Sequence, residues 1–85
     1  MKLIRISAIW CSSCLIMRSR VGELIKEFSY DIEIEELDYE DENAEELCKK
    51  FGLDIEILPI YIRPDNNSYS VGEKSKKEFI RFIEE

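Results

Sequence analysis

The chain contains no histidine, and it has only three cysteines and 12 Lys and Arg residues. Without histidine there is no Ser-His or Cys-His pair to activate a nucleophile, so hydrolases of both kinds are excluded. The 19 Asp and Glu residues outnumber the basic ones and give a formal net charge of -7. Because such a surface repels nucleic acid and anionic lipid, neither is an expected partner.

Long apolar stretches are also missing, since no run approaches the roughly 18 to 20 residues that a helix needs to span a bilayer. Met1 to Ala8 are only eight residues, and the cysteine motif begins at Trp10, which leaves no room for a cleavable signal with an apolar centre. A chain of 85 residues can form one core but not two. We therefore expect a single domain over residues 1–85 that acts in the cytoplasm as a monomer.

The spacing of apolar residues predicts an α/β fold with the element order βαβαββα. Strands are expected over residues 2–8, 31–37, 57–62 and 68–71, and helices from near residue 11 to 28, over 41–51 and over 75–85. A crossover unit followed by a hairpin and a closing helix indicates a four-stranded mixed sheet with three helices on its two faces.

Two of the strands differ in pattern. The strand over 2–8 is mostly apolar, which favours a central place in the sheet. The strand over 31–37 alternates, and its exposed charges favour an outer place. We assign Ile32, Ile34 and finally Leu37 to one side of this strand, and Glu33 and Glu35 to the other.

Cys11 and Cys14 lie three residues apart where the first strand gives way to a helix. The free backbone N–H groups at a helix N-terminus stabilise a thiolate and lower its pKa, so Cys11 is the expected nucleophile. Cys14 lies about one turn further along and is the expected resolving thiol. An odd number of cysteines in a short chain is typical of catalysis or metal binding and not of a structural disulfide framework.

Other interpretations of this pair remain open at this stage. Zinc knuckles use the same spacing, although zinc sites usually need a second pair or histidines, and Cys48 is the only other ligand of that type. The two cysteines can also be structurally incidental. Cys48 itself lies among Leu47 and Phe51 on an apolar helical face, which indicates core packing, with a regulatory thiol as the alternative.

The motif Trp10-Cys11-Ser12-Ser13-Cys14 resembles the thioredoxin active site, with Ser-Ser where typical thioredoxins have Gly-Pro. The resemblance covers nearly the whole chain. Further segments that are similar to the family are Leu37-Asp38-Tyr39, Phe51-Gly52-Leu53 with Leu58-Pro59, and Ser70-Val71-Gly72 followed by Phe79. In length the chain is closer to glutaredoxins and short archaeal-type thioredoxins, because it begins directly at the catalytic strand.

The resemblance implies a thiol-disulfide oxidoreductase that reduces protein disulfides and needs no bound cofactor or metal. A flavoprotein disulfide reductase would supply its electrons. It also implies a cis peptide bond at Pro59, with the backbone of Leu58 pairing with an extended substrate and Trp10 covering the active site. An edge-strand proline and a Trp10 buried in the core are the plain alternatives.

The sequence departs from the thioredoxin pattern at two charged positions. Arg5 stands where the family has a buried acid, and Glu36 stands near the place of its lysine neighbour. We hypothesise that Arg5 and Glu36 form an inverted ion pair whose positive charge lowers a thiol pKa. The alternative is that Arg5 simply reaches solvent.

Two further functions remain as alternatives. The first is a redox-sensing binding module in which the cysteines act as a switch. The second is a glutathione-dependent, glutaredoxin-like protein, although Ile57-Leu58-Pro59 and Val71-Gly72-Glu73 match the glutathione-binding segments of glutaredoxins poorly. The acidic run from Glu33 to Glu46 indicates a solvated face, with electrostatic steering of a basic partner as a second possibility.

Overall fold

The computed structural model describes all 85 residues as one four-stranded sheet with three helices, in the strand order β2-β1-β3-β4. The elements in chain order are β1 (Lys2–Ser7), α1 (Ser12–Phe28), β2 (Glu33–Asp38), α2 (Glu42–Phe51), β3 (Ile60–Arg63), β4 (Ser68–Val71) and α3 (Lys76–Glu84). β1 pairs in parallel with β2 and antiparallel with β3, and β3 pairs antiparallel with β4. The element order βαβαββα and the mixed sheet, with β1 in the centre and β2 at an edge, confirm the predicted fold.

The helices begin and end where local chemistry requires. The Asp41 carboxylate accepts a hydrogen bond from the Asn43 N–H at the start of α2, and Gly52 ends this helix in the left-handed region at φ 68°. At the start of α3, Ser75 and Glu78 form a reciprocal capping box. None of the helices is long and apolar enough to cross a membrane.

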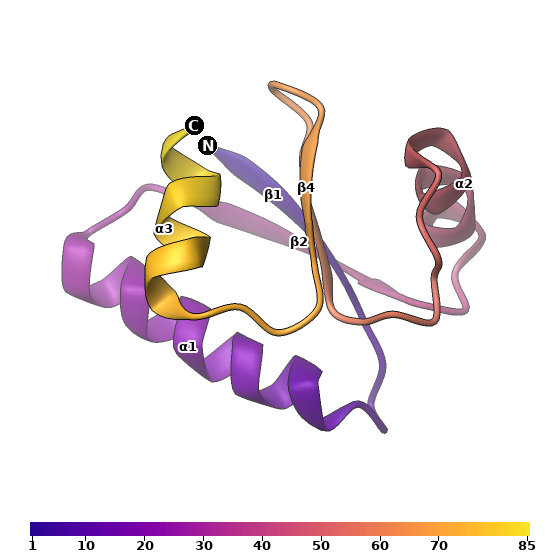
Figure 1. The fold of residues 1–85 in the computed structure, drawn as a ribbon, viewed down its shortest axis with the longest axis horizontal. Helices are drawn as coiled ribbons and strands as arrows, with labels where there is room; N and C mark the ends of the chain where they lie inside the picture. The colour runs from indigo at the N-terminus through magenta and orange to yellow at the C-terminus, as the bar shows by residue number, and fades with distance from the viewer.

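The helices cover both faces of the sheet, with α2 on one side and α1 with α3 on the other (Figure 1). Each face has its own apolar cluster, because successive side chains of a strand point to opposite faces. The α2-side cluster is Ile6, Ala8, Cys11, Cys14, Ala44, Cys48, Leu58, Ile60 and Ile62. The cluster under α1 and α3 is Leu3, Met17, Val21, Leu24, Tyr61, Phe79 and Ile83.

The prediction for Leu37 was wrong. Leu37 packs against the α2-side cluster, whereas Ile34 packs against the cluster under α1 and α3. The two residues are an odd number of positions apart, so a continuous strand places them on opposite faces. The same alternation puts Glu36 on the face of Ile34, where Arg5 also lies.

The predicted strand over 57–62 begins later in the structure, at Ile60. Pro59 has no N–H to donate to a sheet ladder, which keeps it out of the paired region. Its carbonyl accepts a hydrogen bond from the Gly72 N–H at 2.8 Å, so this residue is tied to the end of β4.

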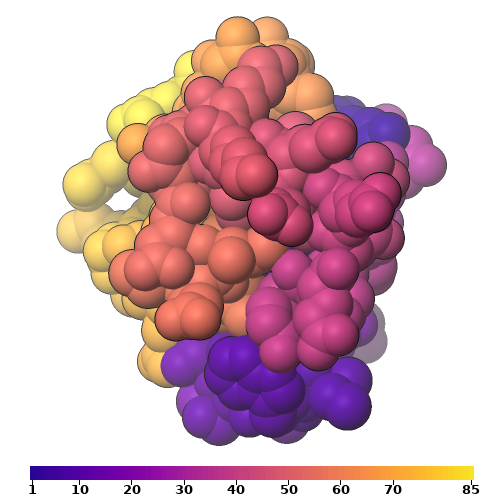
Figure 2. Space-filling view, turned by 90° about the vertical axis from the view of Figure 1, so that its right-hand side faces the viewer, coloured from indigo at the N-terminus to yellow at the C-terminus, as the bar shows by residue number.

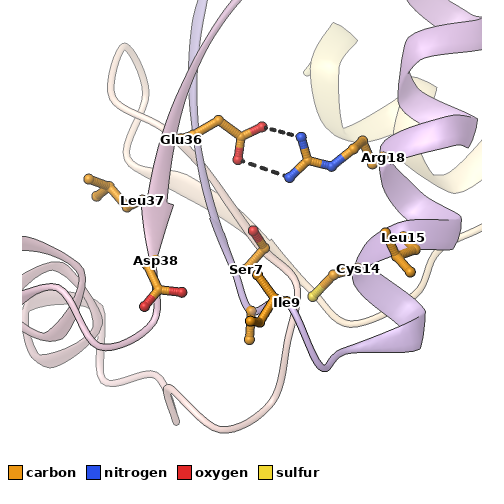
Figure 3. A pocket seen from close by; sticks show the side chains of 9 residues that line it. Ser7, Ile9, Cys14, Leu15, Arg18, Glu36, Leu37 and Asp38 are labelled. Atoms are coloured by element: carbon orange, nitrogen blue, oxygen red, sulfur yellow. Dashed lines mark hydrogen bonds and ion pairs between the residues drawn. The ribbon is translucent and has the colours of Figure 1, made fainter.

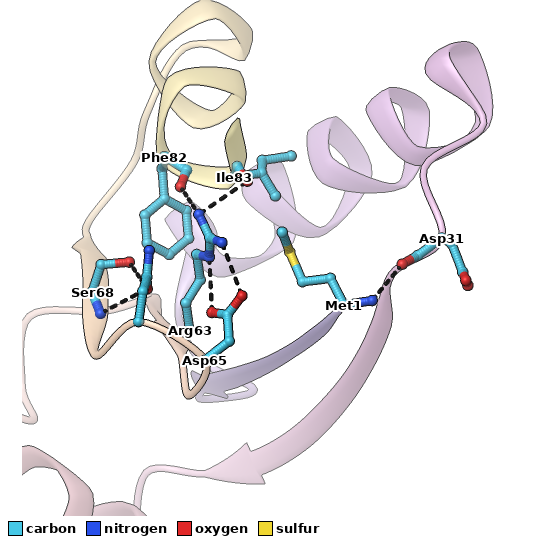
Figure 4. A network of polar contacts seen from close by, with 8 residues as sticks. Met1, Asp31, Arg63, Asp65, Ser68, Phe82 and Ile83 are labelled. Atoms are coloured by element: carbon cyan, nitrogen blue, oxygen red, sulfur yellow. Dashed lines mark hydrogen bonds and ion pairs between the residues drawn. The ribbon is translucent and has the colours of Figure 1, made fainter. Parts of the chain in front are cut away.

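A buried arginine fastens α3 to the β3–β4 hairpin (Figure 4). Arg63 donates to the carbonyls of Phe82 and Ile83 at 2.9 and 3.0 Å, and its guanidinium also binds the Asp65 carboxylate at 3.0 and 3.2 Å. A cation at the C-terminal end of a helix satisfies carbonyls that have no partner within the helix. The last helix is therefore held by polar contacts as well as by its apolar face.

Candidate active site

Cys11 is the N-cap residue of α1, and three residues separate it from the end of β1 at Ser7. Its backbone is extended, with φ -89° and ψ 109°, and its Sγ accepts a hydrogen bond from the Cys14 N–H at 3.2 Å. A sulfur in this position receives both a direct N–H contact and the positive end of the helix dipole. The structure thus brings Cys11 and Cys14 together with both thiols free.

The two cysteines have different surroundings. Cys14 lies deeper, at 4% exposure against 8% for Cys11. Burial raises the pKa of the Cys14 thiol to about 11, and a hydrogen bond with Cys11 adds to this increase. Cys14 therefore keeps its proton near neutral pH, while the Cys11 sulfur is the one that accepts the helix N–H bond.

The loop before β3 lies opposite Cys11. The Leu58–Pro59 peptide bond is cis, and both residues are buried. Leu58 packs in the same apolar cluster as Cys11 and Cys14. It also lines a hollow that Trp10, Cys11, Ser12, Ser13, Glu56 and Ile57 complete.

Trp10 projects from the surface, and its side chain is 62% exposed, so burial in the core was the wrong alternative. Its ring makes an edge-to-face contact with Tyr39, with 5.4 Å between the centroids. Figure 2 shows the indigo segment around Cys11 meeting the orange segment before β3 and the magenta segment after β2. The Trp10–Tyr39 contact and the hollow lined by Cys11 and Leu58 lie where these segments meet.

Arg5 and Glu36 form the hypothesised ion pair, so the solvent-facing alternative for Arg5 was wrong. The Arg5 Nε donates to Glu36 Oε1 at 2.8 Å, a second nitrogen binds the same oxygen, and Nη1 donates to the Tyr61 hydroxyl at 3.3 Å. Burial lowers the pKa of Arg5, but its bonds to Glu36 and Tyr61 outweigh this effect and raise it. The Arg5 guanidinium is thus a permanent positive charge at the position where typical thioredoxins have an acid.

A second guanidinium shares the same carboxylate. Arg18, on α1, approaches Glu36 at 3.1 Å and 3.5 Å, and both line a hollow beside Cys14 (Figure 3). Arg18 and Tyr61 were not among the predicted catalytic or substrate-binding residues. The spacing of four residues between Cys14 and Arg18 predicts that they lie on one helical face. No local sequence pattern predicts the contact between Arg5 and Tyr61.

A family model described as Thioredoxin matches residues 1–85. The chain belongs to the thioredoxin family. This assignment supports a thioredoxin-like redox function for the chain. No curated protein matches it.

Two solved structures from malaria parasites share the thioredoxin fold of this chain. One, described as a malarial protein, has a TM-score of 0.67 at 21% identity, over 98% of this chain and 92% of that one. The other is described as thioredoxin-2, a component of malaria parasite protein secretion machinery. It has a TM-score of 0.61 at 20% identity, over 98% of this chain and 80% of the other. At these identities the likeness concerns the fold alone.

The third cysteine of this thioredoxin-family chain belongs to the core. Cys48, on α2, is 2% exposed and packs in the α2-side cluster, as predicted. Burial and the charge of Asp54 raise the pKa of its thiol. A protonated, enclosed thiol is a poor nucleophile, so Cys48 behaves as a small apolar residue.

Proposed function

We propose that the chain is a thiol-disulfide oxidoreductase that reduces protein disulfides through a dithiol-disulfide cycle of Cys11 and Cys14. The observation that carries this proposal is the bond from the Cys14 N–H to the Cys11 sulfur at the start of α1. It points one sulfur at a helix N-terminus, where a thiolate is stabilised, and keeps the second thiol one turn away.

The cycle balances in two exchange steps. The Cys11 thiolate attacks one sulfur of the substrate disulfide, forming a mixed disulfide and releasing the other sulfur as a thiolate. Cys14 then loses its proton to solvent, and its thiolate attacks the Cys11 sulfur. The second substrate thiolate leaves and takes up a proton, and the enzyme holds the Cys11–Cys14 disulfide. A flavoprotein disulfide reductase is the proposed donor of the two electrons that restore the dithiol.

The surface around Cys11 supports a protein substrate. Exposed apolar side chains gather on both sides of it, with Ile9 at 95%, Trp10 at 62% and Ile57 at 53% exposure. Apolar groups exposed together at a reactive site are typical of a surface that binds a partner. Leu58 lies outside the strand pairing, which begins at Ile60. We therefore assign its backbone to hydrogen bonds with an extended substrate segment, in the manner of an added strand.

The deciding experiment equilibrates the protein in graded dithiol buffers and traps free thiols by alkylation. The reduced chain has three free thiols, and oxidation of the pair would leave only that of Cys48. We expect one reversible two-electron transition at roughly -200 to -300 mV. Cys48→Ala should keep the transition, and Cys11→Ser should abolish it. Absence of an intramolecular disulfide at every potential would refute the proposal. Measurement of bound metal would then test the alternative of a metal site.

Activity is tested separately by insulin reduction with the same variants. Turnover by the wild type and its loss in Cys11→Ser are the expected results. A transition without turnover would instead support a redox-sensing binding module. We further propose that residues 1–85 act as a single domain and as a monomer. We place the chain in the cytoplasm, because an odd number of cysteines in a short chain suits a reducing compartment.

A further inference from the structure

Cys14 borders a hollow with charged residues in its lining, which differs from the hollow lined by Trp10 and Cys11. Ser7, Ala8, Ile9, Leu15, Arg18, Glu36, Leu37 and Asp38 line this hollow together with Cys14. In Figure 3, Cys14 and Arg18 project from the same side of α1, and the Arg18 guanidinium meets the Glu36 carboxylate that projects from β2. The resolving thiol and a guanidinium therefore border the same space.

Two guanidinium groups share the Glu36 carboxylate, and Asp38 is the other carboxylate that lines the hollow. Those guanidinium groups belong to Arg5 and Arg18. Arg5 is buried on β1, and its place is set by Glu36 and Tyr61. Arg18 is half exposed on α1 and lies one helical turn after Cys14.

A cation close to Cys14 would ease the deprotonation that its second exchange step needs. The thiol must lose its proton to attack the mixed disulfide, and burial opposes this loss. Typical thioredoxins have a buried acid beneath the pair, but Arg5 occupies that place here. A nearby positive charge favours the thiolate directly, without accepting a proton.

We propose that Arg18, held by Glu36, is a positioning residue that stabilises the Cys14 thiolate in the step that releases the reduced substrate. This inference rests on the proposed function and concerns its second exchange step. Arg18 acts through Cys14 and touches no substrate atom in this role. The attack of Cys11 on the substrate is independent of it.

Several other groups lie around Cys14. Burial raises the pKa of Cys14 most, and the neighbouring Cys11 thiol raises it further. The Ala8 backbone, which precedes the helix, and the charge of Arg18 on α1 lower it. From the β2 side Asp38 borders the hollow, and its carboxylate accepts a hydrogen bond from the Glu40 N–H at 3.3 Å. From α2, Cys48 is the titratable residue in the apolar cluster that contains Cys14. Arg18 is therefore the cation best placed to act on this thiol.

The two exchange steps can be separated with dithiobis(nitrobenzoate), an oxidant that releases one coloured thiolate at each step. The first release follows attack by Cys11 and depends on reagent concentration. The second follows attack by Cys14 on the mixed disulfide and is independent of concentration. Cys14→Ser identifies the second phase by its loss. Stopped-flow traces across pH then give the pH profile of each step.

Arg18→Gln removes the charge at similar length, Arg18→Lys restores it, and Lys26→Gln makes the same charge change in the last turn of α1. For Arg18→Gln we expect the midpoint of the second phase to rise by about 0.7 pH units, which lowers the thiolate fraction about fivefold near neutrality. A more basic thiolate is a better nucleophile and recovers about twofold of this loss, so the net slowing is two- to threefold. The first phase should not change.

Arg18→Lys should recover most of the rate, and Lys26→Gln should match the wild type. A second phase whose pH profile is the same in Arg18→Gln and wild type would overturn the inference while leaving the dithiol mechanism intact. A first phase with no second phase in the wild type would instead refute the proposed function itself. An equal slowing in Lys26→Gln would show a general charge effect and would also overturn the role of Arg18.

Discussion

Replacing Glu36 with glutamine leaves the buried Arg5 guanidinium without its counter-charge. The Arg5 side chain is 8% exposed and that of Glu36 is 41% exposed, so the pair lies at the edge of the core. Removing one partner of a fully buried pair costs about 3–5 kcal/mol. Water screens this pair from the Glu36 side, and glutamine keeps an acceptor oxygen, so we expect a loss of about 1–2 kcal/mol in the free energy of unfolding.

The neighbouring Glu35→Gln variant is the matched control. Glu35 pairs with Lys2 at 2.8 Å on the same two strands, but both side chains are about half exposed. Such a surface pair contributes at most about 0.5 kcal/mol. Urea unfolding, with a slope of about 1 kcal/mol/M for a small domain, should therefore show a midpoint lowered by about 1 M or more for Glu36→Gln only. Equal midpoints for the two variants would refute the idea that Arg5 depends on Glu36.

Two other variants test the core and the hairpin. Cys48→Ala should lower the free energy of unfolding by about 1 kcal/mol, measured in urea, because it leaves a small void in the α2-side cluster; an unchanged stability would show that this thiol is not packed as described. Hydrogen bonds from Arg63 hold the pKa of Asp65 below its ordinary value of 3.8. This group therefore adds stability above about pH 4 that is lost as pH falls through its lowered pKa. Thermal unfolding below pH 4 should show a shallower acid loss in Asp65→Asn, and an identical acid profile would contradict the contact.

The features predicted correctly from the sequence depend on short stretches of chain. Helical spacing and a terminal glycine locate α2 and its end at Gly52, because both signals lie within one or two turns. The position of Cys11 at a helix N-terminus is equally local. The cis bond at Pro59 agrees with what the family resemblance implied, although residue spacing alone did not predict it.

The errors and omissions concern relations between strands. Leu37 lies on the α2 side because side chains alternate along a continuous strand and Leu37 is three positions after Ile34. The apolar residues of β2 do not alternate strictly, so they did not show this. The late start of β3 at Ile60 follows from the missing N–H of Pro59. No single segment shows that Tyr61 on β3 would meet Arg5 on β1, because antiparallel pairing sets that contact.

By itself the sequence determined the fold class, the element order and the location of the cysteine pair, since each follows from periodicity and from the chemistry of a helix start. The tertiary structure alone decided what surrounds that pair. Arg5 is buried and not solvent-facing because the parallel register sets Arg5 opposite Glu36 and the antiparallel register sets it opposite Tyr61. Arg5 contacts Glu36, which lies 31 positions further along the chain, and Tyr61, which lies 56 positions further along. Such contacts depend on the packing of the whole sheet, which no local pattern encodes.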